Sequence, residues 1–400
     1  MAFSEFRDKF AIVGLGLTNQ GHLPGISGRA LEAEAARLAI EDAGLRREDI
    51  DGYIHTFMDA AVGGFVQWSD VAPRILGLPI KFYFNVSRGG ASVALSIIAA
   101  TKFLELGIAK YVIVSYAMNE WSKPRKGDTS EGRVATTFNL KDGLWGPVFG
   151  CLDAVHIHSH IATRHMSEYG TTSRQLGAIA VAARQWACLN PAAYMYGRPI
   201  TIEDHQNSPI IAWPYHLLDI CLMTDGGTAF IVTTAERAKG LRKPPVYIMG
   251  AGFGEMAMKL WWEKGNYTRF AVETAKADAF RQAGLELKDI DVAEIYDCFT
   301  AEVLVNLEDY GWCEKGEGGP FVEEGNIAPG GTIPVNTGGG LLSSFYQSDF
   351  TGLSEAVIQL RGAGGARQVK DAEVALVTGH GGELITPGMC AIHSTLILRR

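Results

Sequence analysis

The sequence predicts a duplicated α/β protein in which strands alternate with helices and a separate segment is inserted between the two copies. The pattern of residues 10–54, a buried strand, an amphipathic helix and a short connection to a second strand, recurs at 246–295. Gly accounts for 47 of the 400 residues, which suits many tight strand–helix turns. Such alternation implies mixed or parallel sheets covered by helices on both faces.

The repeat is visible residue by residue. Residues 39–51 and 279–291 share seven identities in thirteen positions. Both stretches carry Ala-Gly-Leu where the helix should end, and Gly at that place can adopt the left-handed conformation that closes a helix. The third part repeats more loosely: residues 89–117 and 338–382 each contain a Gly-rich turn, an apolar helix and a strand, in that order.

The repeat also predicts the domain organisation. The N-terminal half is expected to comprise residues 1–117 and 211–243, and the C-terminal half residues 244–400. Residues 118–210 have no counterpart in the second half and are polar, with several His and Trp residues. We interpret them as an inserted loop domain over the first half.

Composition excludes several classes of protein. A formal charge of −8 and a pI near 5.7 argue against a nucleic-acid or anionic-membrane partner. The six cysteines are scattered, without a CxxC pair or zinc spacing, as is typical of reduced thiols. There is no apolar run of signal-peptide length and none of the roughly 20 residues that a membrane span needs. We therefore expect a cytoplasmic protein without a membrane span.

Several familiar motifs are incomplete or absent. Gly-Leu-Gly at 14–16 follows a strand, but the third glycine of a dinucleotide fingerprint is missing. His156 and His160 lie one helical turn apart in a His-rich stretch, without the carboxylate spacing of an HExxH metal site, and a structural role is the alternative. The GxSxG nucleophile elbow is also absent. We predict no metal site and no cofactor required by the chain itself.

Three longer stretches point to one family: residues 201–238, residues 294–304 (EIYDCFTAEVL) and residues 336–362 (NTGGGLLSSFYQSDFTGLSEAVIQLRG). Together with the Gly-rich turns, they resemble the thiolase superfamily, above all the sterol-carrier or lipid-transfer-type thiolases. The resemblance covers most of the chain and keeps the order and spacing of these stretches. It implies a thiolase fold with α/β/α/β/α layers, and an acyl-CoA substrate, so that coenzyme A enters as part of the thioester.

The sequence departs from the family where catalysis takes place. Family members that form or break carbon–carbon bonds by Claisen chemistry use a cysteine at the N-terminus of a first-half helix, where the thiolate is stabilised. The matching stretch, residues 85–97, contains no cysteine; its hydroxyls belong to Ser87, Ser92 and Ser96. Acyl-enzyme formation is therefore not expected.

Two imidazoles and a second thiol of the family are also replaced. The histidine of the second-half Gly-rich loop falls on Tyr346, and the histidine of the His-Asp-Cys-Phe motif falls on Tyr296. The late cysteine that acts as acid and base falls on Gly379, next to His380. Paired replacements within intact surroundings indicate a different reaction in the same cavity.

A phenol, with an ordinary pKa of about 10, both donates and accepts a hydrogen bond. Retro-aldol cleavage of a β-hydroxyacyl thioester needs removal of the β-hydroxyl proton and protonation of the resulting enolate, without a covalent intermediate. The pattern resembles the thiolase-like aldolases that shorten steroid side chains, releasing acetyl-CoA or propionyl-CoA and leaving a ring ketone. We predict that Tyr296 and Tyr346 transfer the protons; which is base and which is acid stays open.

Supporting residues follow from the same comparison. Asp297 either orients its neighbour or caps a turn, and His380 either faces the cavity or sits on a turn. Backbone N–H groups near Gly residues could approach the thioester oxygen; the expected substrate-binding residues are Gly89, Gly90, Ser92, Cys298 and Gly381. The basic residues Lys123, Arg125, Lys126 and Arg133 either bind CoA phosphates or form a solvated loop.

The resemblance also implies partners. The relatives act with a small accessory subunit, which contains an OB-like domain and a zinc ribbon, and form dimers through the first-half sheet, so a homodimer within a hetero-oligomer is expected. Two other functions stay open. One is an acyltransferase or condensing enzyme with Ser92 or Cys298 as nucleophile. The other is a catalytically silent scaffold that binds acyl-CoA or lipid and serves the accessory subunit.

Overall fold

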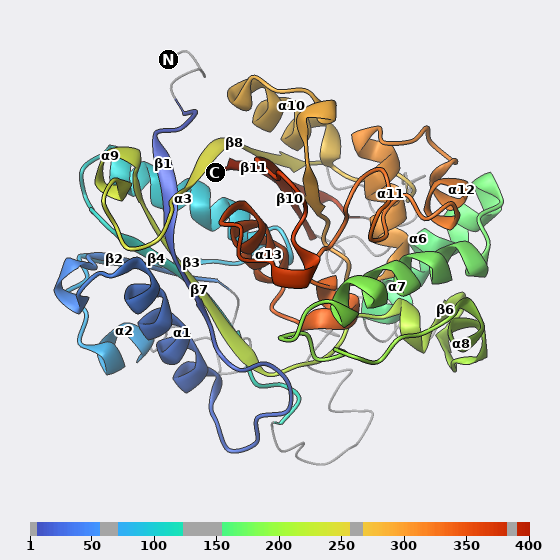
Figure 1. Ribbon diagram of the computed structural model, residues 1–400, viewed down its shortest axis with the longest axis horizontal. Coiled ribbons are helices and arrows are strands. Elements are labelled where there is room, and N and C mark those ends of the chain that lie inside the picture. Colours follow the sequence, from blue (N-terminus) through green and yellow to red (C-terminus); the bar gives the residue numbers. More distant parts are fainter. Residues whose placement is uncertain (1–5, 57–70, 123–153, 257–266, 382–389) are drawn as a thin grey trace, which may run out of the picture.

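A computed structural model describes residues 6–56, 71–122, 154–256, 267–381 and 390–400 (Figure 1). The first half contains β1 (Phe10–Leu17), α1 (Gly28–Ala43), β2 (Gly52–Thr56), α2 (Val71–Leu76), β3 (Phe82–Val86), α3 (Ser92–Glu105), β4 (Val112–Met118), β7 (Gly226–Thr234) and α9 (Ala235–Ala238). The second half contains β8 (Val246–Glu255), α10 (Val272–Ala283), β9 (Val292–Glu294), α11 (Thr300–Tyr310), α12 (Gly318–Glu323), α13 (Phe350–Leu360), β10 (Val374–Gly381) and β11 (Ile392–Arg399). Between the halves lie α6 (Ala154–Tyr169), α7 (Ser173–Cys188), α8 (Ile202–Asn207), β5 (Ile210–Ala212) and β6 (Tyr215–His216).

The predicted repeat is present element by element. Helices α1 and α10 end at Gly44 and Gly284, which have φ values of 70° and 63°, the left-handed conformation expected there. Each helix is followed by a single 3₁₀ turn, Arg47–Asp49 or Leu287–Asp289, whose last Asp accepts a hydrogen bond from the backbone before the turn. The two halves therefore resemble each other not only in sequence but also in how the helix and the following turn are closed.

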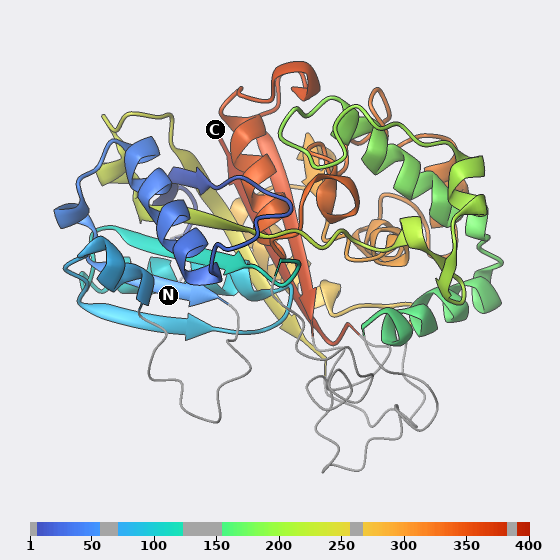
Figure 2. The ribbon, with the colours of Figure 1, turned by 90° about the horizontal axis from the view of Figure 1, so that it is seen from below.

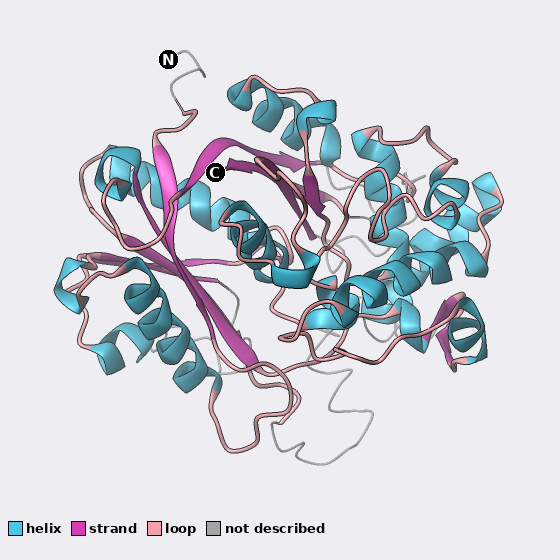
Figure 3. Ribbon diagram, viewed as in Figure 1, coloured by secondary structure: helices cyan, strands magenta, loops and turns pink. Residues whose placement is uncertain are grey.

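All long strands belong to one mixed sheet with the order β3-β2-β4-β7-β1-β8-β11-β10-β9. The sheet consists of two half-sheets, which among the described residues are joined where β1 and β8 pair at Ala11–Tyr247 and Ile12–Val246. Figure 3 shows the strands of each half fanning away from this short seam. Within each half, parallel pairs such as β2–β4 and β9–β10 place strand ends at a common edge.

Alternate residues of the strands face different helix layers, which creates three cores. Along β1, Ile12 faces the core that contains α3 and α13, whereas Ala11 and Val13 face the core under α1. The outer face of the second half-sheet is covered by α10 and α11. The result is the predicted α/β/α/β/α order, with α3 and α13 between the half-sheets (Figure 2).

The inserted segment lies on the second half. Leu176 and Ile179 of α7 share a core with Val303 and Leu304 of α11, and the Trp186 indole donates a hydrogen bond to the Ile327 carbonyl at 3.1 Å. The expectation that this segment lies over the first half is wrong for its described helices, because their apolar faces are buried against α11 and α12. The predicted boundary at 210–211 falls inside β5. In the described part of the chain no helix is long and apolar enough to cross a membrane.

Candidate active site

The two predicted tyrosines meet at the centre of the molecule. Tyr296 follows the carboxyl end of β9, and its backbone N–H donates to the Thr378 hydroxyl at 3.1 Å. Tyr346 follows a π-helical turn (Gly340–Ser344), and its N–H donates to the Thr224 hydroxyl at 2.8 Å. The two phenols lie close enough that Tyr346, through its charge and hydrogen bonding, helps to raise the pKa of Tyr296. The fold thus brings together side chains that lie 50 residues apart in the sequence.

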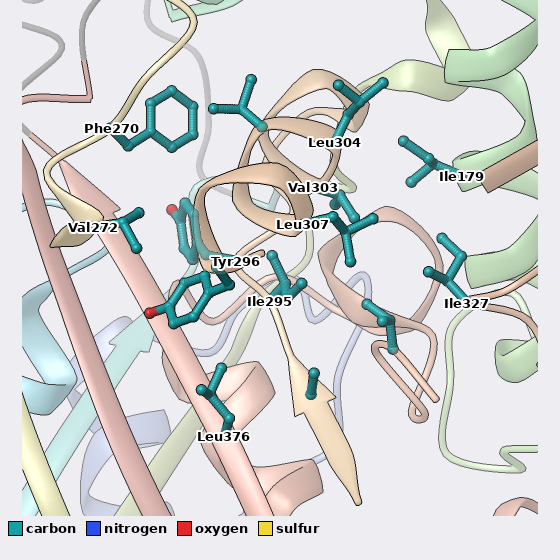
Figure 4. Packing of buried hydrophobic residues seen from close by; sticks show 14 of the residues in the cluster. Ile179, Phe270, Val272, Ile295, Tyr296, Val303, Leu304, Leu307, Ile327 and Leu376 are labelled. Carbon is teal, nitrogen blue, oxygen red and sulfur yellow. The ribbon is translucent and has the colours of Figure 1, made fainter. Parts of the chain in front are cut away.

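The surroundings keep one phenol protonated. Tyr296 is buried, 8% exposed, among the apolar side chains of the second-half core (Figure 4). Burial, followed by the neighbouring Tyr346 and the thiols of Cys298 and Cys221, raises the pKa of Tyr296 well above 10. Tyr346 is only half-buried. The Tyr296 phenol is therefore neutral at physiological pH.

His380 and Gly90 enclose the ring of Tyr296. The His380 imidazole meets this ring edge-on, with centroids 4.7 Å apart. A Cβ atom on Gly90 would lie 2.4 Å from Cζ of Tyr296 and 2.7 Å from the His380 carbonyl oxygen. Gly381 is packed in the same way, with a Cβ position 2.4 Å from the Arg88 carbonyl oxygen. These glycines thus allow the turn before α3 to lie against β10 and Tyr296.

Ser92 and Gly89 form the turn that leads into α3. The Ser92 hydroxyl donates to the Gly89 carbonyl at 2.6 Å and accepts from the Arg88 N–H at 2.8 Å. Gly89 has a φ of 57°, which a residue with a side chain rarely adopts. The hydroxyl of Ser92 is thus engaged in closing the turn.

Asp297 contacts the loop that carries Tyr346. Its carboxylate accepts hydrogen bonds from the N–H groups of Leu341, at 2.8 Å, and Leu342, at 3.3 Å. A Cβ on Gly340 would lie 2.0 Å from one of its oxygens. Burial raises the pKa of Asp297 to about 7, against the opposing effect of these N–H groups. Of the two roles expected for Asp297, orienting its neighbour or capping a turn, these contacts correspond to capping a turn.

Cys298 contacts His380 and lies near Tyr296. Its Sγ is 3.7 Å from Nε2 of His380, and it lies within 4.8 Å of possible ligand atoms of His158 and Glu302. Nδ1 of His158 is hydrogen-bonded to Oε1 of Glu302. Cys298 thus links His380 to a buried His–Glu pair.

Three further residues that were not predicted from the sequence lie at the site. Burial and the nearby Tyr346 and Asp349 raise the pKa of Tyr116, on β4, well above 10. The thiol of half-buried Cys221 lies close enough to raise the pKa of Tyr296, and the Cys221 N–H donates a hydrogen bond to the Cys298 carbonyl at 2.9 Å. Tyr116 comes from the first half and stands in no family motif. Cys221 lies within residues 201–238, a stretch that resembles the family, but nothing there marks this residue as part of a site.

Asp349 is the third such residue. One of its oxygens accepts a hydrogen bond from the Val93 N–H, at the start of α3, at 2.7 Å. Its other oxygen has no hydrogen-bond partner within the described residues and is buried. Asp349 lines a cavity of about 10 Å³ together with Tyr296 and Asp297, which is room for one water molecule. The one sign in the sequence that Asp349 belongs to the site is its position three residues after Tyr346.

The candidate CoA-binding residues Lys123, Arg125, Lys126 and Arg133 lie outside the described residues.

Comparison with known proteins identifies the family. A family model described as "Thiolase C-terminal domain-like" matches residues 257–400. The chain is 36% identical over 375 residues to the steroid side-chain-cleaving aldolase of Thermomonospora curvata, covering 92% of this chain and 94% of that protein. It is also 36% identical over 389 residues to the 17-hydroxy-3-oxo-4-pregnene-20-carboxyl-CoA lyase of Mycobacterium tuberculosis, covering 92% and 95%.

The fold agrees with these relatives. A solved structure entitled "Ltp2-ChsH2(DUF35) aldolase" superimposes with a TM-score of 0.86 and 34% identity, covering 98% of both chains. The chain therefore belongs to the thiolase superfamily, among the sterol-carrier-type, thiolase-like proteins that include steroid side-chain-cleaving aldolases.

Proposed function

We propose that the protein is a carbon–carbon lyase that cleaves a β-hydroxyacyl-CoA, with a steroid ring as the bulky part, into a ring ketone and acetyl-CoA or propionyl-CoA. The observation that carries this proposal is the hydrogen-bonded pair of phenols, Tyr296 and Tyr346, at a site without the family's nucleophilic cysteine. Relatives named as a steroid side-chain-cleaving aldolase and as a carboxyl-CoA lyase support the same chemistry.

The two phenols divide the proton transfers. Tyr296 stays protonated because burial raises its pKa, so it serves as the acid and donates its hydrogen bond to the oxygen of Tyr346. Tyr346 accepts that hydrogen bond and serves as the base in its phenolate form. Tyr346 removes the β-hydroxyl proton, the Cα–Cβ electron pair passes to the thioester enolate, and Tyr296 protonates Cα. The proton on Tyr346 then returns to Tyr296 through their hydrogen bond.

The remaining site residues support this reaction in different ways. His380 and Gly90 fix the ring of Tyr296, and Asp297 holds the turn before Tyr346. Coenzyme A takes part as the thioester of the substrate, and Lys123, Arg125, Lys126 and Arg133 are proposed to contact its phosphates. A small accessory subunit is proposed as partner of a homodimer, supported by the solved aldolase structure whose title includes ChsH2(DUF35).

A product assay tests the proposal. The protein, with and without the accessory subunit, is incubated with a β-hydroxyacyl-CoA that carries a tertiary alcohol on a steroid ring, and the products are separated by chromatography. We expect a ring ketone and a short acyl-CoA, both lost in Tyr346→Phe. Absence of the ketone with several such substrates, in the presence of the accessory subunit, would favour the binding-scaffold alternative.

A further inference from the structure

Two buried His–Glu pairs join helix α6 of the inserted segment to helix α11 of the second half. His158 is hydrogen-bonded to Glu302, and Nε2 of His165 lies 3.0 Å from Oε2 of Glu308. The four side chains are at most 2% exposed. The pairs have the same chemistry and join the same helices, but they lie at different distances along α11 from the active site.

The first pair adjoins the candidate active site. The His158 ring lies 4.6 Å from Phe299 and 5.9 Å from His380, measured between centroids. Cys298 lies near both histidines: its Sγ is 3.7 Å from Nε2 of His380 and within 4.8 Å of possible ligand atoms of His158 and Glu302. His380 in turn packs against Tyr296. A hydrogen bond, the Cys298 thiol and an edge-on ring contact therefore connect Glu302, in that order, to the phenol that we assign as the acid.

The second pair has a different environment. Nδ1 of His165 is 2.8 Å from the Thr171 hydroxyl, and Glu308 accepts a hydrogen bond from the Gly318 N–H at 2.9 Å. The ammonium group of Lys315 lies 3.1 Å from Glu308. These contacts connect the end of α6 to the loop before α12. Substitutions of His165 and Glu308 therefore serve as a control: they show how much the loss of a buried His–Glu pair lowers stability at a distance from the active site.

We propose that His158 and Glu302 are positioning residues for the aldol cleavage: they fix the Cys298–His380 contact against which the Tyr296 ring rests. This inference rests on the proposed function. A hydrogen bond between an imidazole and a carboxylate is strong and directional in a dry interior, so it restricts the orientation of the imidazole. Proton transfer from Tyr296 to carbon tolerates only small displacements of the phenol, and a shift of its support changes the rate.

The pair is also part of a cluster of ionisable side chains. The ionisable groups that face it come from four other segments; they are Tyr215 on β6, Cys221 before β7, Cys298 after β9 and His380 on β10. The Tyr215 hydroxyl approaches Oε2 of Glu302 at 3.4 Å, and its ring stacks on Phe299 with centroids 5.2 Å apart. A change of charge at Glu302 therefore affects groups next to Tyr296.

The test compares His158→Gln and Glu302→Gln with the matched controls His165→Gln and Glu308→Gln. For the first two variants we expect kcat to fall roughly ten- to hundredfold, with KM within about threefold of the parent value and a changed pH profile of kcat. The control variants should lose similar or greater thermal stability but keep kcat within about twofold and the same pH profile. A pH profile and kcat for the first two variants that match the controls would overturn the inference.

Tyr215→Phe is a milder probe, because it removes a hydroxyl next to Glu302 and keeps the ring stacked on Phe299. If His158→Gln and Glu302→Gln do not fold, a displaced pH profile in Tyr215→Phe supports the inference, and a profile identical to that of the parent overturns it. Failure of the proposed function is recognised separately, since the parent protein would then release no ketone.

Discussion

Tyr296 and His380 meet edge-on, with ring centroids 4.7 Å apart and planes at 88°. The contact joins the loop after β9 to strand β10, and Gly90 from the first half closes it from the other side. Both halves of the duplicated chain therefore fix the phenol on which the proposed chemistry depends, and substitutions in either half can be used to examine it.

Replacing Tyr296 by Phe should lower kcat by about a hundredfold or more, because the proposed acid is lost. Stability should change little, since the buried ring remains. Steady-state kinetics of ketone release, together with thermal unfolding, measure both effects. The control is Tyr310→Phe, which removes a buried hydroxyl that contacts His393 at 3.0 Å in the same core and should leave kcat near the parent value. Equal kcat in Tyr296→Phe and the parent would exclude Tyr296 as the acid.

Gly90→Ala should lower both activity and stability. The new Cβ would overlap the Tyr296 ring and the His380 carbonyl, and the carbonyl belongs to a buried strand that cannot move aside easily. We expect a loss of about 1–3 kcal/mol in the free energy of unfolding, together with a reduced kcat. Gly28→Ala is the control: its new Cβ would lie 3.4 Å from the nearest atom, Oδ1 of Asn119, so kcat and stability should stay near the parent values. Normal kcat and stability in Gly90→Ala would contradict the close packing.

Asp297 should give the protein a measurable pH dependence of stability. Its folded-state pKa of about 7 lies above the ordinary value of 3.8, so the folded state binds this proton more tightly than the unfolded state. Its contribution to stability is complete below about pH 4 and is lost as the pH rises towards 7. Asp297→Asn cannot ionise, so between pH 5 and 8 its stability relative to the parent should rise by roughly 2–3 kcal/mol.

Denaturant unfolding of both proteins at several pH values measures this difference. Asp204→Asn is the control, because Asp204 is exposed and the pKa of its carboxyl is lowered by hydrogen bonds from Thr201 rather than raised. A difference between Asp297→Asn and the parent that stays constant from pH 5 to 8 would show that Asp297 is ionised throughout that range.

No acyl-enzyme should form. After exposure to acyl-CoA, intact-protein mass spectrometry should find only the unmodified mass, because residues 85–97 contain no cysteine and the Ser92 hydroxyl is engaged in its turn. Ser92→Ala should reduce stability by about 1 kcal/mol, through loss of the turn hydrogen bonds, and keep most of the activity. An adduct on Ser92 or Cys298 would support the acyltransferase alternative instead.

The local and repeated features of this structure could be predicted from the sequence. Helix α1, its closure at Gly44 and the same features of α10 follow from periodicity and from the conformational freedom of glycine, which are properties of short segments. The duplication then predicts two similar half-sheets. The two phenols were recognised because each stands within a motif whose other residues match the family.

Tertiary structure decided the rest, because side chains from distant segments converge only after folding. No local pattern marks Tyr116 or Cys221 as a site residue, and His158 comes from a stretch that was interpreted only as metal-binding or structural. The placement of the insert on the second half depends on which apolar faces complement each other. The sequence alone thus determined the family, the repeat and the paired phenols, whereas only the packing of both halves and the insert decided which groups surround those phenols and hold them in place.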